Sequence, residues 1–80
     1  MDILAFDKTG QKALFCECKF RNKPMPMEEY DDLVTASNIF TNVKKKYLFF
    51  FSKSGFTNPV IERAKNEGST LLTLKDLYEI

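Results

Sequence analysis

Residues 2–20, DILAFDKTGQKALFCECKF, place two apolar runs on either side of a short polar segment that contains Gly10. Apolar runs of this length around a glycine-containing polar loop are typical of a β-hairpin. The pattern therefore predicts one strand over residues 2–6 and a second over residues 13–20. The helices and strands that follow in the sequence are expected to pack against or pair with this hairpin.

The elements downstream of the hairpin alternate between helical and extended patterns. The sequence predicts a helix over 27–42, an aromatic strand over 47–52, a helix capped by Asn58 that ends at Gly68, a strand over 70–73 and a last helix over 74–80. A helix between two buried strands implies a right-handed parallel crossover, whereas the hairpin is antiparallel. We therefore expect an α/β layered domain with a mixed sheet and the order β-β-α-β-α-β-α.

Composition narrows the class of protein. Eighty residues form a single domain, and a hydrophobic share of 44% with eight Phe is enough for a core, which excludes disorder. The formal net charge of +1 excludes nucleic-acid binding by bulk positive charge alone. No apolar run approaches the roughly 20 residues of a membrane helix. The absence of histidine excludes catalysis by a histidine base, and two cysteines read as reduced core residues indicate a cytoplasmic protein.

Charged residues interrupt the second strand. If residues 8–11 form the hairpin loop, paired residue numbers add up to 19, and Asp2 faces Glu17. Like charges placed directly opposite each other destabilise a strand pair, and a divalent cation between the two carboxylates would remove that repulsion. Lys19 shares the face of Glu17 because side chains alternate along a strand. The alternative interpretation is a strand end that emerges into solvent, with Glu17 and Lys19 as a weak ion pair.

A second group of polar residues follows the aromatic strand. The crossover brings its end to the same sheet edge as Glu17, and this edge usually holds the ligand in α/β sheets. We predict a phosphate-binding group there, formed by Ser52, Lys53, Ser54, Thr57 and Asn58, the last two at a helix N-terminus. The alternative is that Ser54 belongs to a simple turn and Asn58 is only a cap.

Asp2 followed across the hairpin by Glu17-Cys18-Lys19 resembles the PD-(D/E)xK superfamily of restriction-endonuclease-like nucleases. The longer stretches DILAFDKTGQKALFCECKFRNKPM and YLFFFSKSGFTNPVIERAKNEGSTLLTLKDL resemble nuclease-like domains at the C-terminus of archaeal-type ATPases, and also Mrr-like endonucleases. The likeness covers nearly the whole chain.

The resemblance implies an endonuclease that hydrolyses DNA phosphodiesters with Mg²⁺ or Mn²⁺. Asp2 and Glu17 would hold the metal, with the Cys18 carbonyl as a further ligand. Lys19 would orient the attacking water or stabilise the charge that develops on the phosphate. A metal-bound water and a nearby cation are sufficient for this chemistry without histidine.

The chain departs from the family pattern at its start. Met1 precedes Asp2 where the family often has proline, and the helix and first strand that open the family fold are missing. We therefore expect residues 1–80 to be a truncated or C-terminal fragment of a nuclease-like domain, or a degenerate remnant of one. A non-catalytic module that binds DNA, docks to an ATPase portion or forms a homodimer through the exposed sheet edge is the alternative.

Overall fold

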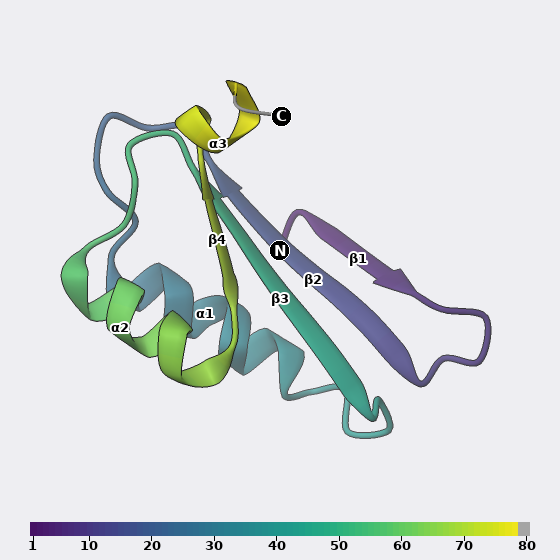
Figure 1. Cartoon of the computed structure of the whole chain (residues 1–80). Helices are drawn as coiled ribbons and strands as arrows, with labels where there is room; N and C mark the ends of the chain where they lie inside the picture. Colours follow the sequence, from purple (N-terminus) through teal and green to yellow (C-terminus); the bar gives the residue numbers. More distant parts are fainter. Residues whose placement is uncertain (79–80) are drawn as a thin grey trace.

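The computed structural model describes residues 1–78, and its secondary structure confirms the α/β class with a mixed sheet. The elements follow one another as β1 (Ile3–Phe6), β2 (Lys12–Lys19), α1 (Met27–Ser37), β3 (Lys45–Ser52), α2 (Asn58–Glu67), β4 (Thr70–Thr73) and α3 (Leu74–Tyr78). In space the strands lie in the order β1-β2-β3-β4 (Figure 1). β1 is antiparallel to β2, and both other pairs are parallel.

The hairpin forms in the predicted register. Leu4 pairs with Phe15 and Phe6 with Ala13, so paired numbers add up to 19. The Asp7 N–H donates to the Lys12 carbonyl over 3.0 Å and closes the loop. β2 begins one residue earlier than predicted, at Lys12, and ends at Lys19 rather than at residue 20.

Helices α1 and α2 both lie on one side of the sheet (Figure 1). Ala13 and Phe15 of β2 face them, and both are buried against Tyr30, Leu33 and further core residues. Because side chains alternate along a strand, Cys16 and Cys18 point to the opposite face of the sheet, which these two helices do not cover. The core is therefore one-sided, and the end of β2 carries Glu17 and Lys19 on the helix-covered face.

The first helix ends earlier than predicted, at Ser37 rather than at residue 42. The Ser37 hydroxyl donates to the Val34 carbonyl over 2.7 Å, and Lys46 Nζ donates to the Ser37 carbonyl over 2.7 Å, so the helix end has its own partners. Leaving the helix lets the chain place Phe40 against Phe6 and Phe15, with ring centroids 5.8 and 5.5 Å away. Aromatic packing across the sheet thus overrides the local helical pattern.

The start of the second helix differs from its prediction by one residue. Thr57, not Asn58, is the N-cap residue: its backbone is extended, and its carbonyl accepts the Ile61 N–H over 3.1 Å. Asn58 is the first helical residue, and Pro59 follows it. Gly68 ends this helix in the left-handed conformation, as predicted.

The last two elements begin as predicted. β4 covers Thr70–Thr73, and the Asp76 carboxylate accepts the Thr73 N–H over 2.6 Å at the start of α3, which is one of the two bonds of the predicted capping box. The Thr73 hydroxyl donates to the same carboxylate. The predicted end of this helix at residue 80 lies outside the described residues.

β3 begins two residues before the predicted strand, at Lys45, whose N–H donates to the Gln11 carbonyl over 3.0 Å.

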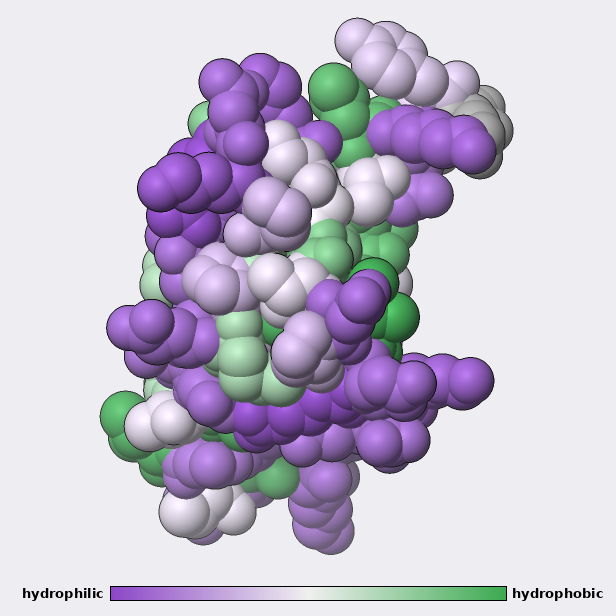
Figure 2. All heavy atoms as spheres, turned by 90° about the vertical axis from the view of Figure 1, so that its left-hand side faces the viewer, coloured by the Kyte–Doolittle hydropathy of each residue, from purple (hydrophilic) through white to green (hydrophobic). Residues whose placement is uncertain are grey.

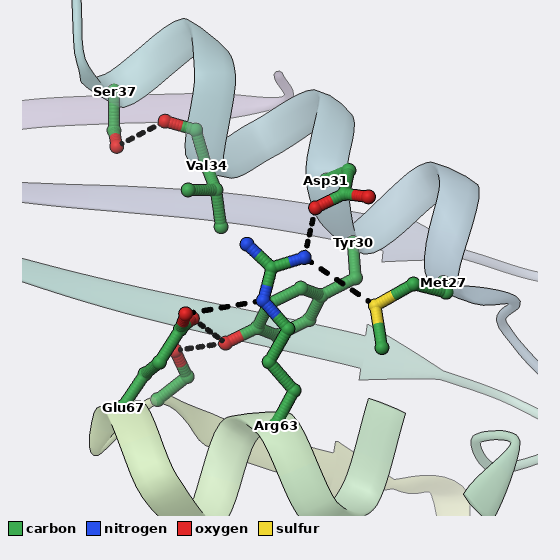
Figure 3. Close-up of polar contacts among 8 residues, drawn as sticks. Met27, Tyr30, Asp31, Val34, Ser37, Arg63 and Glu67 are labelled. Carbon is green, nitrogen blue, oxygen red and sulfur yellow. Dashed lines mark hydrogen bonds and ion pairs between the residues drawn. The ribbon is translucent and has the colours of Figure 1, made fainter. Parts of the chain in front are cut away.

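A polar cluster joins the two long helices above the sheet. Arg63 of α2 forms ion pairs with Asp31 of α1 and with Glu67, and its guanidinium lies 4.9 Å from the centre of the Tyr30 ring (Figure 3). The Tyr30 hydroxyl donates to Glu67 and shares a hydrogen bond with Ser69, both at 2.8 Å. These contacts hold α1 at a fixed distance from α2 and therefore fix where the first turn of α1 meets β2.

Candidate functional site

A pocket of about 200 Å³ lies where β2 ends on the helix-covered side of the sheet. Its lining residues are Met1, Glu17, Lys19, Glu29 and Asp32. Glu17 and Lys19 reach it because they continue the face of Phe15 beyond the buried part of the strand. The structure therefore brings two of the three predicted catalytic residues to one cavity.

The carboxylate of Glu17 is held by two ammonium groups. The N-terminal ammonium of Met1 lies 3.0 Å from one oxygen, and Lys19 Nζ lies 3.5 Å from the other. The Glu17 side chain is only 13% exposed, whereas that of Lys19 is 34% exposed. Both ion pairs are thus partly shielded from water, and the negative charge of Glu17 is matched by neighbouring cations.

The first strand begins at Ile3 rather than at residue 2, so the predicted pairing of Asp2 directly opposite Glu17 in the strand ladder is wrong. The Asp2 N–H donates to the Cys16 carbonyl over 2.9 Å, and the Asp2 carboxylate accepts the Cys18 N–H over 2.6 Å. Asp2 and Glu17 thus lie at the same end of the hairpin, but each carboxylate has its own partners. Their mutual repulsion is relieved by an N–H donor on one side and ammonium groups on the other.

Cys18 contributes to this end of the hairpin through its backbone. Its N–H holds Asp2, and its carbonyl points to the same edge of β2, since both groups of one strand residue point the same way. Its thiol lies on the other face, 3.9 Å from that of Cys16. Burial, followed by the neighbouring thiol and the carboxylates of Asp2 and Glu17, raises the pKa of Cys16 to about 11. This thiol therefore stays protonated at neutral pH and is a poor nucleophile.

Sequence reasoning missed two acidic residues of the pocket. Glu29 and Asp32 are three residues apart and therefore share one face of α1. Glu29 is paired with Arg21 of the loop that leads from β2 into α1. The sequence contained a signal for these two residues. The loop between β2 and α1 is short, so the first turns of α1 must lie near the end of β2.

The predicted phosphate-binding residues do not form one group. Ser52 is fully buried on the helix-covered face, and its hydroxyl makes no hydrogen bond. Lys53 Nζ donates to Asn22 over 3.1 Å, and the Ser54 hydroxyl donates to the Arg21 carbonyl. Thr57 and Asn58 begin α2, and no side chain caps that helix. Met25 joins the loop before α1 to the loop before α2. Its N–H donates to the Gly55 carbonyl, and its carbonyl accepts the Thr57 N–H.

The ligands that the resemblance implies are all oxygen donors, the kind that magnesium prefers and softer metals do not. Asp2, Glu17 and the Cys18 carbonyl offer hard oxygen ligands, and proteins often hold Mg²⁺ with one or two carboxylates together with water and substrate phosphate. Within residues 1–78, however, no group of three or more Cys, Asp or Glu side chains is arranged to hold a metal ion.

Comparison with known proteins adds no assignment: no family model, curated protein or solved structure matches the chain. Within the described residues, no helix has both the length and the apolar character that crossing a membrane requires.

Proposed function

We propose that this domain has a restriction-endonuclease-like fold and hydrolyses DNA phosphodiesters with Mg²⁺ or Mn²⁺. The observation that carries the proposal is the arrangement at the end of β2. Glu17 and Lys19 enter one pocket, while Asp2 is held against the backbone of Cys18, between them in sequence. Two of the three residues of the proposed site thus share one pocket, and the third lies at the same end of the hairpin, which supports the proposal.

Each residue has a distinct part in the proposed reaction. Asp2, Glu17 and the Cys18 carbonyl would hold the metal, which supplies a water of lowered pKa and polarises the phosphoryl oxygen. Lys19, the more exposed member of its ion pair with Glu17, would turn its ammonium toward the phosphate and stabilise the charge that develops there. Ser52 is too deeply buried in this conformation to contact a phosphate. The basic side chain that lines the pocket is that of Lys19.

The ion pairs of Glu17 predict a weak metal site. A metal at Glu17 would compete with the ammonium groups of Met1 and Lys19 for the carboxylate oxygens. We therefore expect millimolar rather than micromolar metal to be needed, and cleavage to be favoured once DNA supplies phosphate oxygens as further ligands.

The test is cleavage of supercoiled plasmid DNA with millimolar Mg²⁺ or Mn²⁺. Lys19→Ala and Glu17→Gln are each expected to lower the rate by at least 100-fold, which is the order of the loss when a transition-state contact is removed. The matched control is Lys65→Ala, an exposed lysine of α2 outside the pocket, which should cleave like wild type. Equal cleavage by wild type and Lys19→Ala would reject this site.

A second candidate is a module that binds DNA or docks to an ATPase portion without catalysis. The ion pairs of Glu17 favour it, because they stabilise the site in the absence of a metal. The two candidates differ in their response to Mg²⁺. A metal site raises the melting temperature with increasing Mg²⁺ by linkage. A melting temperature that does not respond, together with DNA binding and no cleavage, would favour the non-catalytic module.

A further inference from the structure

β1 is an edge strand that remains exposed throughout its length. Its sequence, Ile-Leu-Ala-Phe, is entirely apolar, yet all four residues are exposed, with Ile3 at 50%, Leu4 at 39% and Phe6 at 48%. Isolated exposed apolar residues are ordinary, but β1 exposes apolar side chains on both faces of the sheet, Leu4 and Phe6 on one and Ile3 and Ala5 on the other. Figure 2 shows that the helix-bearing side of the molecule is, by contrast, mainly hydrophilic.

The outer edge of β1 has free backbone groups. Asp7 bonds inward to Lys12, and inward and outward residues alternate along an antiparallel strand. Ala5 therefore bonds inward to β2, whereas the N–H and C=O groups of Leu4 and Phe6 point outward, where β1 has no neighbouring strand within residues 1–78. Proteins usually protect such edges with lysine, proline or a bulge inside the strand. β1 contains neither lysine nor proline.

The overall dimensions agree with a surface that is left uncovered. The accessible surface is 5522 Å², against roughly 5000 Å² expected for a compact monomer of this mass. The radius of gyration is 12.7 Å, against about 11.6 Å expected for this length. Both differences indicate a molecule less compact than a typical monomer of its size.

We propose that a second copy of this chain pairs with the edge of β1 to form a two-fold symmetric dimer. An antiparallel pair centred on Ala5 places Leu4 opposite Phe6 of the partner subunit, and the symmetry axis creates the same pair again. Both residues have outward backbone groups, so each pair can exchange two N–H···O bonds. The edge is thus complementary to itself.

Charge also favours this register. With Ala5 on the axis, residues whose numbers add up to 10 lie opposite each other, so Asp2 lies toward Lys8 of the partner subunit and no like charges meet. The new contacts Leu4–Phe6 extend the aromatic cluster of Phe6 with Phe40. The dimer thus joins the two four-stranded sheets into one continuous sheet. The pocket at the end of β2 stays open in each copy.

The experiment is sedimentation equilibrium of the full chain over a dilution series from millimolar to sub-micromolar. Wild type is expected to pass from twice the monomer mass to the monomer mass. Leu4→Pro removes an outward N–H and the Leu4 side chain but no hydrogen bond to β2, so it should raise the dissociation constant at least tenfold with an unchanged circular dichroism spectrum. Phe6→Lys, which keeps the backbone intact, should do the same and serves if the proline variant does not fold.

Tyr47→Lys is the matched control, because Tyr47 is 43% exposed on the sheet face that α1 and α2 do not cover. It should dimerise like wild type. A wild-type protein that remains monomeric at millimolar concentration would overturn the proposal. So would dimers that withstand both β1 substitutions but dissociate in Tyr47→Lys, since the interface would then be the uncovered face.

Discussion

At the scale of single residues, Asp7 shows how one side chain sets the hairpin register. Its carboxylate accepts the N–H groups of Gln11 and Lys12 over 3.0 and 3.1 Å and the hydroxyl of Thr9 over 2.9 Å. The hydrogen bond from Lys12, followed by those from the other loop residues, holds the pKa of Asp7 below its ordinary value despite some desolvation. The loop therefore closes around a charged carboxylate, and that closure aligns Asp2 with the end of β2.

Asp7→Ala should lower the melting temperature at pH 7 because three loop donors lose their acceptor. Since the folded state lowers this pKa, the charged carboxylate stabilises wild type above the ordinary pKa, and this stabilisation is lost as the pH falls through the lower value of the folded protein. The melting-temperature difference between wild type and variant should thus shrink below about pH 4. Thermal melts from pH 7 to pH 2 measure it, and a constant difference would contradict the role of the charge.

At the scale of elements, glycine and aromatic residues decide where helices end. Gly68 ends α2 with φ = 76°, and the N–H groups of Gly68 and Ser69 both reach the Ala64 carbonyl. This end can be predicted because only glycine adopts that conformation readily. The end of α1 at Ser37 cannot, because it depends on the contact of Phe40 with rings from two other elements.

Gly68→Ala should reduce the free energy of unfolding by about 1 kcal/mol, the order of the cost of a left-handed alanine. An added Cβ would meet no atom within 4 Å, so the effect is one of backbone conformation alone. Urea unfolding measures it, with Asn66→Ala as a control inside the same helix, where alanine is favourable. If the free energy of unfolding falls by less than about 0.3 kcal/mol, the backbone at residue 68 has left the left-handed conformation in the variant.

At the scale of the whole molecule, Tyr30 links both long helices to the sheet. The residue is fully buried, and its ring stacks on Phe50 of β3 with centroids 4.5 Å apart. Arg63 lies over the ring, and Glu67 and Ser69 bind the hydroxyl (Figure 3). Because burial raises the pKa of Tyr30, the hydroxyl remains a donor over the whole neutral range.

Tyr30→Phe keeps the ring but removes the hydroxyl, so it should destabilise the protein by about 1.5–3 kcal/mol, the cost of losing a hydrogen bond to a charged group. Chemical denaturation measures the change. Tyr47→Phe, at an exposed tyrosine, is the control and should have little effect. If both variants unfold alike, the cluster does not join the helices as described.

The candidate site was predictable where it depends on strand periodicity. Glu17 and Lys19 share a face because side chains alternate. The hairpin register brings Asp2 to the end of β2, where the Cys18 N–H holds its carboxylate. The partners of these residues were not predictable. The Met1 ammonium at Glu17 and the carboxylates of Glu29 and Asp32 reach the pocket through contacts between separate segments.

The amino-acid sequence alone determined the hairpin, its register, the α/β class and the left-handed end of α2, since these depend on neighbouring residues and on the periodicity of strands and helices. The tertiary structure decided which charges neutralise Glu17, why Ser52 is buried and where α1 ends. It also decided that the apolar edge of β1 stays uncovered. These outcomes depend on which segments meet across the sheet, because the energies of burial and of charge pairing arise only after distant parts of the chain have packed together.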